Sequence, residues 1–364
     1  MAMRSSPNPK TPSPVNGLRP RPASIWPNGT LAAALLFGIG LTVGWVLHSG
    51  GKATEQRPTE RDAAGADHGA ALAQSITPTQ VRAHHAGLSH PLLYCDEAVA
   101  DNHLDALHTS ISGVFARAVT AGTLSHGSVV YRTLDSGNGF EIDADRKYHP
   151  ASLLKLPLAI AWMRRAESNP GILERKLPYA LQTLREAADT PGALIGGESY
   201  TARELMERMI RWSRNDAKAV LAQEIGDDAV KAVYAELDFP WPFTSPDIDP
   251  ELSARDYSRL FRVVYDASML HPKAADELLQ MLSTTEYDAA LKAGLPAGTQ
   301  VAHKWGHRNV KGAPRQAAEQ LHDCGIIYKP GRPFLLCVMT AGVDEAALGK
   351  VIADVARNAW NAEL

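Results

Sequence analysis

The sequence predicts an α+β fold of the three-layer αβα type, in which an antiparallel sheet is flanked by helices and joined to an all-helical lobe. Strand-like apolar runs bounded by turn residues stand near both ends of the folded region, at 128–134, 140–144, 300–305, 323–328 and 333–340. The long stretch between them carries the apolar period of helices, and one more helical segment closes the chain. Strands from both ends must therefore meet in one sheet, and the helices between them form the lobe.

The first part of the folded region predicts a helix and a hairpin. Between 101 and 121 the apolar side chains fall near one stripe, formed by Leu104, Leu107, Ile111, Val114, Phe115 and Val119. The strand at 128–134 is followed by the turn residues DSGNG at 135–139 and by a return strand from 140 to 144. The next helix, from Ser152, is apolar nearly all round, which is typical of a buried helix.

Further helices and three strands follow. Thr201 and Glu204 form a capping-box pattern that predicts the start of a helix, and Gly226 is suited to end the helix after Asn215. Residues 236–252 contain four prolines and no apolar period, which predicts a surface loop. The other predicted helices lie at 253–269, 272–282 and 346–361.

The composition is that of a globular protein of 364 residues, 45% hydrophobic and 21% charged. This length suits one large domain or two ordinary ones. The net charge of −3 gives no general basic character, so we expect no nucleic-acid partner. No cysteine or histidine spacing is typical of a metal site, and we expect neither a metal nor a cofactor. The oligomeric state is not readable from the sequence.

The first 90 residues predict a membrane tether. Residues 1–30 carry four cations, many prolines and no acidic residue, and are expected to be disordered. Residues 31–47 run without a charge, nearly far enough to cross a bilayer, and the cations before them favour a cytoplasmic amino terminus. Residues 48–90 are predicted to be a flexible tether. The domain at 91–364 would then be periplasmic on a single-pass inner-membrane anchor, with a cleaved signal as the alternative.

The chain has three cysteines, at positions 95, 324 and 337. The segments around the last two predict strands joined by a four-residue loop at 329–332. In a symmetric hairpin with that loop, Cys324 and Cys337 occupy facing positions. In an exported domain they could form a disulfide, and two free buried thiols are an equally good alternative.

The stretch HPASLLKLPL, residues 149–158, carries the first candidate catalytic pair. Ser152 stands at the mouth of the predicted helix, near the positive end of its dipole, and Lys155 lies one turn in on the same face. A lysine acts as a base near neutral pH only where burial and a neighbouring cation lower its pKa. Ser152 is therefore a candidate nucleophile and Lys155 its candidate base.

Three short motifs stand in order along the chain: Ser152-x-x-Lys155, Ser213-x-Asn215 and Lys304-x-Gly306. This ordered set resembles the signature of the serine β-lactamase and penicillin-binding protein superfamily, S-x-x-K, S-D-N and K-T-G. The resemblance covers essentially all of 91–364, and its spacing is most similar to class A β-lactamases. It implies a β-lactamase/transpeptidase-like fold and a serine hydrolase that forms an acyl-enzyme.

The resemblance also implies a role for each residue. Ser152 would attack the carbonyl carbon, Lys155 would take its proton, and Ser213 would relay a proton to the departing nitrogen. Asn215 would bind the substrate's side-chain amide and help to fix Lys155. Lys304 would attract the substrate carboxylate, and its charge would help to hold the base lysine neutral.

Two backbone N–H groups complete the implied site. Those of Ser152 and His307 are the expected oxyanion hole, and Gly306, which lacks a side chain, lets substrate approach the edge strand. Taken alone, each polar residue has a structural explanation as a helix cap, a turn residue or a solvated edge-strand lysine. Their joint occurrence favours the catalytic interpretation.

The chain departs from the family pattern in two ways. Arg214 and Trp305 stand where the signature has Asp and Thr or Ser, and Trp305 could narrow the cleft or supply a stacking surface. In addition, the Glu-x-x-Leu-Asn pattern whose Glu activates the deacylating water in class A enzymes does not occur between Ser213 and Ser253. That region offers only nearby carboxylates, Asp238, Asp247, Asp249 and Glu251.

Three functions are therefore compatible with the sequence. The first is β-lactam hydrolysis through a Ser152 acyl-enzyme. The second is a penicillin-binding-protein-like D,D-peptidase acting on peptidoglycan peptides, or an enzyme that deacylates slowly, which the missing Glu favours. The third is a non-catalytic cell-wall-binding module, which the intact candidate residues argue against.

Overall fold

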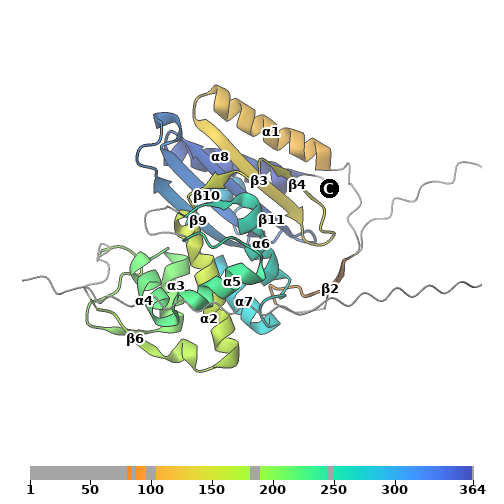
Figure 1. The fold of residues 1–364 in the computed structure, drawn as a ribbon. Coiled ribbons are helices and arrows are strands. Elements are labelled where there is room, and N and C mark those ends of the chain that lie inside the picture. Colours follow the sequence, from red (N-terminus) through yellow and green to blue (C-terminus); the bar gives the residue numbers. More distant parts are fainter. Residues whose placement is uncertain (1–79, 83–86, 96–103, 181–188, 244–249, 363–364) are drawn as a thin grey trace, which may run out of the picture. The chain divides into compact units, whose positions relative to one another are not determined.

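The computed structural model describes residues 80–82, 87–95, 104–180, 189–243 and 250–362. All of them belong to the second of the two units into which the chain divides, 72–364. Figure 1 shows this unit as a sheet with helices along it and a lobe of further helices. The predicted segments 1–30 and 31–47, and nearly all of the predicted tether, lie outside the described residues.

The strands are β1 (Gln80–Arg82), β2 (Leu92–Cys95), β3 (Leu124–Thr133), β4 (Gly139–Ile142), β5 (Lys147–Tyr148), β6 (Lys176–Pro178), β7 (Ser199–Thr201), β8 (Leu252–Ser253), β9 (Val301–Asn309), β10 (Glu319–Ile327) and β11 (Phe334–Gly342). The α-helices are α1 (Asp105–Thr120), α2 (Lys155–Ser168), α3 (Ala202–Arg211), α4 (Asn215–Ile225), α5 (Asp227–Glu236), α6 (Ala254–Tyr265), α7 (Pro272–Ser283) and α8 (Glu345–Asn361). Short 3₁₀ helices are η2 (Ala151–Leu154), η3 (Ile172–Glu174), η4 (Leu291–Gly294) and η5 (Arg315–Ala317).

The central sheet has the strand order β4-β3-β11-β10-β9 and is antiparallel throughout. Its two amino-terminal strands therefore pair with three carboxy-terminal strands, which confirms that both ends of the domain build one sheet. β9 is an edge strand, and the start of η2 packs against it. The remaining strands form two-stranded pairs: β1 with β2, β5 with β8, and β6 with β7.

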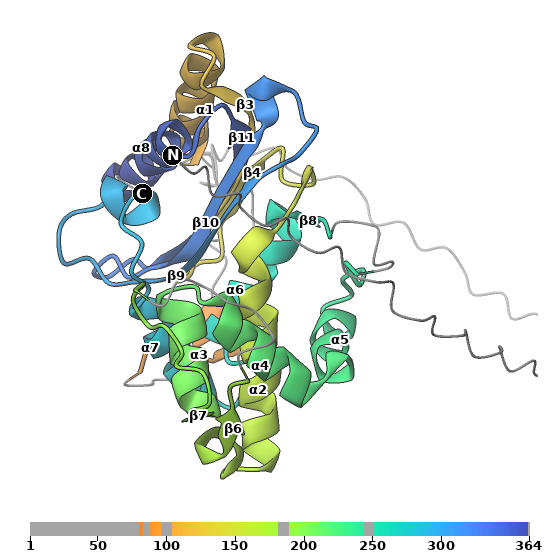
Figure 2. The ribbon, with the colours of Figure 1, turned by 90° about the vertical axis from the view of Figure 1, so that its left-hand side faces the viewer.

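The two faces of the sheet are covered by different helices. α1 and α8 pack together and against one face, where Ile111, Leu336, Val338 and Ile352 form part of a buried cluster. α6 covers the other face and joins it to the lobe, whose core surrounds α2. Figure 2 shows α1 and α8 along one side of the sheet and the lobe helices gathered away from them. The α+β fold is thus confirmed.

Several local signals act as the sequence predicts. The Thr201 side chain accepts a hydrogen bond from the Glu204 N–H, and the Glu204 carboxylate accepts one from the Thr201 N–H, so the capping box is formed. Gly226 ends α4 with φ of 78°, a conformation that glycine adopts without steric cost. The chain between 227 and 236, for which no element was predicted, forms α5.

Two of the predicted strands are shorter than those in the structure. β9 continues four residues beyond Trp305 to Asn309, and β10 begins at Glu319 instead of Asp323. The added residues are mostly polar, and several of their side chains form hydrogen bonds with other segments, so hydropathy alone does not reveal these extensions. The hairpin of β6 and β7 was also not predicted.

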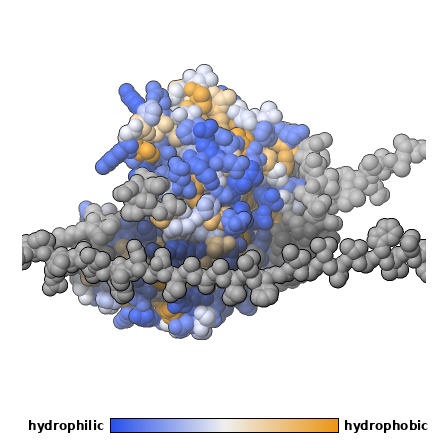
Figure 3. Space-filling view, viewed as in Figure 1, coloured by the Kyte–Doolittle hydropathy of each residue, from blue (hydrophilic) through white to orange (hydrophobic). Residues whose placement is uncertain are grey.

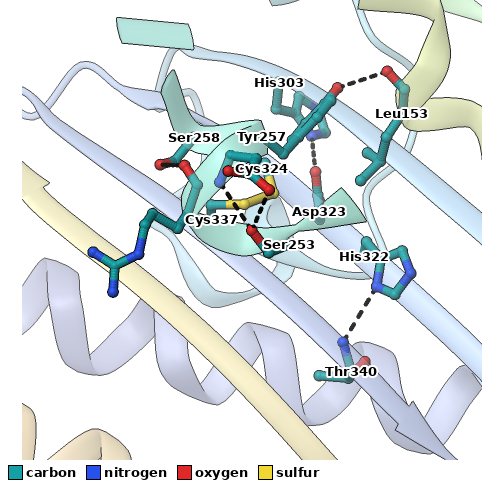
Figure 4. Close-up of a disulfide and its surroundings, with 12 residues drawn as sticks. Leu153, Ser253, Tyr257, Ser258, His303, His322, Asp323, Cys324, Cys337 and Thr340 are labelled. Atoms are coloured by element: carbon teal, nitrogen blue, oxygen red, sulfur yellow. Dashed lines mark hydrogen bonds and ion pairs between the residues drawn. A yellow bond between two sulfur atoms is a disulfide. The ribbon is translucent and has the colours of Figure 1, made fainter. Parts of the chain in front are cut away.

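The cysteine prediction is confirmed in its stronger form. Cys324 and Cys337 face each other in the register of β10 and β11 and form a disulfide. Both are fully buried on the face of the sheet that α6 covers. Figure 4 shows the bridge beside Ser253 and Tyr257 at the amino-terminal end of that helix.

Because most large apolar side chains are buried in the core, few of them remain on the surface. On the face shown in Figure 3, hydrophilic residues predominate and hydrophobic ones are scattered. Among the described residues, the exposed large hydrophobic ones are Val119, Ile195 and Phe243. Within the same residues, no helix has the length and apolar character needed to cross a bilayer.

Candidate active site

Ser152 and Lys155 lie at the junction of two helix types. Ser152 is in the 3₁₀ helix η2, and Lys155 is the first residue of α2. Residues three apart eclipse each other in a 3₁₀ turn, and the Lys155 Nζ is 2.8 Å from the Ser152 Oγ. The sequence prediction that these side chains share one face is therefore confirmed.

Lys155 is 2% exposed and is surrounded by oxygen atoms. Besides Ser152, its Nζ contacts the Ser213 carbonyl oxygen at 2.5 Å, the Ser213 Oγ at 3.0 Å and the Asn215 Oδ1 at 2.8 Å. Even an ammonium has only three protons for these four oxygens. The Lys155 amine therefore cannot donate to all four oxygens at once. When the amine is neutral, one of the two serine hydroxyls can donate its proton to the nitrogen, which is the arrangement that a general base requires.

Lys304, on strand β9, contacts the Ser213 hydroxyl from the side of the sheet. It is fully buried, and its Nζ donates to the Ser213 Oγ at 3.0 Å and to the Trp305 carbonyl oxygen at 2.9 Å. Burial holds the pKa of Lys304 well below its ordinary value, the positive charge of Lys155 lowers it further, and Asp323 opposes the shift. Because the two amines flank one hydroxyl and repel each other as cations, the site favours a state with fewer than two positive charges.

The Ser213 hydroxyl is oriented by these two amines. A hydroxyl has one proton and two acceptor positions, and both amines lie within 3.0 Å of its oxygen. When it accepts from both, its own proton points to a third group. This geometry suits a relay that gives a proton to a leaving atom.

Two residues of the site have positive φ without being glycine. Ala151, directly before Ser152, has φ of 48°, and Ser213 has φ of 56°. Such conformations cost about 1–3 kcal/mol and persist where surrounding contacts enforce them. Both reacting segments are therefore held in place by the fold.

Gly306 brings the edge strand against the start of η2. A Cβ at Gly306 would lie 3.0 Å from both the Ser152 nitrogen and the Pro150 oxygen. Real Cβ contacts are rarely this short, so any side chain here would push β9 away from Ser152. Glycine is needed at this position for close approach and not for φ.

The side chain of His307, next along β9, is held by two carboxylates. Its Nε2 lies 2.7 Å from Glu319 Oε2, and its Nδ1 lies 3.4 Å from Glu345 Oε2. Glu319 also accepts from Asn309 at 2.6 Å. These contacts fix the residue whose backbone N–H is the candidate oxyanion donor.

Arg214, one of the two departures from the signature, contacts a carboxylate and a hydroxyl. It is 4% exposed and forms a two-point ion pair with Asp216, at 3.1 Å from Nε and 2.5 Å from Nη2. It also donates to the Thr190 hydroxyl. Arg214 therefore links the segment that contains Ser213 to Thr190 and stabilises that segment.

Trp305, the other departure, stacks on Tyr287 with ring centroids 3.9 Å apart and an angle of 12° between the rings. The Tyr287 hydroxyl in turn donates to Glu345 at 3.1 Å. One face of the indole is therefore already covered, and substrate cannot stack on it. The Lys304 Nζ lies 5.3 Å from the centroid of the same ring, so Trp305 also contacts the charge beside the site.

The structure tests only two of the four candidate loop carboxylates. Asp238 and Glu251 are exposed, and Asp247 and Asp249 lie outside the described residues. The site residues that the sequence analysis missed are His149, Gln320 and His322, which contact the backbone before Ser152, and Tyr257, whose hydroxyl donates to the Leu153 carbonyl at 3.0 Å. None belongs to a short motif, because each is brought in by sheet register or helix packing.

This geometry agrees with the comparisons to known proteins. The family model of the beta-lactamase enzyme family matches residues 110–362, well over half of the chain. The chain belongs to this family. The resemblance found in the sequence motifs is thereby confirmed, and the buried amine–serine cluster occupies the middle of the matched region.

A curated relative supports the same family. Extended-spectrum beta-lactamase PER-1 of Pseudomonas aeruginosa is 40% identical over 87 residues, which are 23% of this chain and 27% of that protein. The chain thus matches little more than a quarter of the length of this relative.

Solved structures show the same fold. PBP-A has a TM-score of 0.60 and 22% identity, over 71% of this chain and 96% of that chain. A beta-lactamase from Xanthomonas campestris pv. campestris has a TM-score of 0.59 and 21% identity, over 72% and 99%. A beta-lactamase from Chitinophaga pinensis has a TM-score of 0.60 and 20% identity, over 71% and 99%.

Proposed function

We propose that this member of the beta-lactamase family hydrolyses β-lactams through an acyl-enzyme on Ser152. One observation carries the proposal: the buried Lys155 amine lies 2.8 Å from the Ser152 hydroxyl and shares the Ser213 hydroxyl with Lys304. A nucleophile, a base within hydrogen-bond reach and a proton relay thus stand in one chain of contacts. Family membership supports the β-lactam as the substrate.

In the acylation step, the Ser152 oxygen bonds to the lactam carbonyl carbon while Lys155 takes the hydroxyl proton. The developing oxyanion is stabilised by the backbone N–H groups of Ser152 and His307. As the carbon–nitrogen bond breaks, the Ser213 hydroxyl gives its proton to the leaving nitrogen and is reprotonated from Lys155. Lys304 holds the substrate carboxylate, and that anion favours the charged form of its amine.

Deacylation needs a water that attacks the Ser152 ester, releases the acid and returns the proton to the serine. The absence of a Glu-x-x-Leu-Asn pattern supports a second candidate function, a penicillin-binding-protein-like enzyme whose acyl form persists. A single-residue variant of PBP-A, with the same fold, has been solved as an acyl-enzyme complex with penicillin G.

The experiment is a time course of intact mass after penicillin G is added to the full-length chain purified in detergent. A Ser152 adduct that appears and then decays supports hydrolysis, and a persistent adduct supports the second candidate. Ser152→Ala is the control and must take no adduct. If the wild-type chain takes none either, both proposals fail and the non-catalytic binding module becomes the better explanation.

The role of Lys304 is tested by the same method. Lys304→Ala should weaken acylation by about 10- to 100-fold, the effect expected when a charge-assisted hydrogen bond to a carboxylate is lost. A penicillin methyl ester, which lacks that charge, should lose less from the substitution than penicillin does, because only the effect of Lys304 on Ser213 and Lys155 remains. An equal loss for the acid and the ester would show that Lys304 does not recognise the carboxylate.

We also propose that residues 31–47 anchor the protein in the inner membrane with the domain on the periplasmic side. The uncharged stretch and the cations before it support this arrangement. A reporter fused after residue 90 should be active only in its periplasmic form. Activity of a reporter that works only in the cytoplasm would contradict the proposal.

A further inference from the structure

In the turn that leads into Ser152, the backbone of His149 is attached to the sheet by two side chains. The backbone N–H of His149 donates to the Gln320 Oε1 at 2.9 Å, and its carbonyl oxygen lies 3.1 Å from the His322 Nε2. Gln320 and His322 are two apart on β10, so their side chains extend from the same face of the sheet. The backbone N–H and the carbonyl oxygen of His149, three positions before Ser152, are therefore both held by side chains of β10.

The sheet register explains why these two side chains can reach the turn. His322 stands opposite Gly306 on β9. Since Gly306 has no side chain, η2 sits directly over β9, and the imidazole beside it can extend beneath the turn to the His149 carbonyl.

The His322 ring has a fixed tautomer. Its Nδ1 accepts from the Thr340 N–H at 3.3 Å, which is drawn in Figure 4, so the proton of the neutral ring is on Nε2 and is donated to His149. The ring is fully buried, and burial lowers its pKa to about 4. The neutral form satisfies both contacts, whereas a second ring proton would point at the Thr340 N–H.

The turn itself needs this support. The His149 Nδ1 accepts from the Ala151 N–H at 3.1 Å, and Ala151 has the unfavourable φ of 48°. The strained residue is thus held by His149, which is held by the sheet. If the His149 backbone moves, the conformation that presents Ser152 loses its support.

We propose that His322, acting with Gln320 as a clamp on His149, is a positioning residue for the Ser152 nucleophile. It touches neither substrate nor the reacting atoms. It fixes the turn so that the Ser152 Oγ remains within reach of Lys155. The inference adds a positioning role to the proposed acylation and rests on that function only for its kinetic consequence.

The test compares three variants of the full-length chain. His322→Leu removes the donor to His149, whereas His322→Gln keeps an N–H at nearly the same reach. Ile326→Val is the matched control, because Ile326 is equally buried on the same strand but lies far from the turn in the register. It removes buried volume without touching the clamp.

Hydrogen exchange of the His149 amide, which donates to Gln320, shows whether the turn loosens when the His322 contact to the neighbouring carbonyl is lost. It is followed by mass spectrometry of overlapping peptides. His322→Leu should speed this exchange at least about tenfold, while His322→Gln and Ile326→Val stay within about threefold of wild type. An unchanged rate in His322→Leu would overturn the clamp.

Penicillin acylation measures its consequence. In His322→Leu the acylation rate constant should fall about 10- to 100-fold, the size of effect that small misplacements of reacting groups produce. The dissociation constant of the initial complex should change less than about threefold, because its contacts to Lys304 and Asn215 remain. A normal rate constant with fast exchange would overturn the positioning role. A wild-type chain that takes no adduct overturns the proposed function, and the exchange rate then still decides the clamp.

Discussion

The turn that carries Ser152 and the turn that carries Ser213 both contain a residue of positive φ, yet they are anchored differently. The first is held by the sheet, through His149 and Gly306. The second is held within the lobe, through the buried ion pair of Arg214 and Asp216. One anchor depends on the long-range register of strands, and the other on two residues of the turn itself. Different perturbations should therefore loosen one turn and spare the other.

The largest expected effect is on the Ser213 side. Arg214→Leu leaves the Asp216 carboxylate buried without its partner and should destabilise the protein by about 3–5 kcal/mol. Replacing both, with Arg214→Met and Asp216→Leu, should restore most of that stability, because no charge is left buried. Urea unfolding checks both. A double variant as unstable as the single one would show that the loss does not come from the unpaired carboxylate.

The next effect is on the sheet. Cys324 is fully buried two residues from His322, and the disulfide closes a segment with a sequence separation of 13. Replacing Cys324 and Cys337 by alanine should cost roughly 3 kcal/mol of unfolding free energy, by the loss of loop closure in the unfolded chain. It should also speed the hydrogen exchange of the His149 amide. A double variant as stable as the wild-type chain, with unchanged exchange, would contradict this prediction.

Acid should act on the sheet-held turn through His322. The pKa of this residue is lowered from 6.5 to about 4, mainly by burial; hydrogen bonds to the His149 and Leu321 backbones oppose the shift, and the charges of His149 and His307 add to it. The unfolded chain therefore takes up the proton before the folded chain does. The contribution of the neutral His322 ring to the unfolding free energy is fully present above pH 6.5, and it falls by roughly 3 kcal/mol as the pH drops to 4. Unfolding free energies at pH 7, 5.5 and 4.5 should fall less steeply in His322→Gln, and parallel curves would contradict this.

The smallest effects separate backbone strain from chemistry. Ala151→Gly should stabilise the protein by up to about 1 kcal/mol, because glycine adopts positive φ without steric cost. Ser213→Gly and Ser213→Ala should be equally slow in acylation, since both lack the hydroxyl, but the glycine variant should be more stable by about 1 kcal/mol. Melting curves and mass spectra check these pairs. If glycine is the less stable residue at both positions, the turns are not strained.

The sequence predicts well which candidate side chains come together, because each belongs to a short motif with local causes. Ser152 and Lys155 are three apart in one turn, and Ser213 and Asn215 frame the start of α4, so spacing alone brings each pair together. The facing positions of Cys324 and Cys337 also follow from loop length. The family signature then links motifs that are far apart in the chain.

What the sequence does not predict depends on contacts between distant segments. The His149–His322 hydrogen bond joins residues 173 positions apart. The stacking of Tyr287 on Trp305 covers one face of an indole ring for which the sequence analysis considered a role in the cleft. Arg214 could not be recognised as half of an ion pair, because Asp216 reads equally well as a first-turn helix residue. Neither hydropathy nor spacing reports which face of an edge strand a neighbouring loop will cover.

The pairing of β3 with β11 has a consequence for the way this chain acquires its structure. Leu124–Thr133 must wait for Phe334–Gly342 before the middle of the sheet can form, so the contacts that matter most have a large sequence separation. Such topologies fold slowly, because loop closure is costly before the pairing repays it. The segment with Ser152 leaves the ribosome long before its supporting strands exist. The growing chain therefore cannot assemble the sheet that supports Ser152 until its last strand is made.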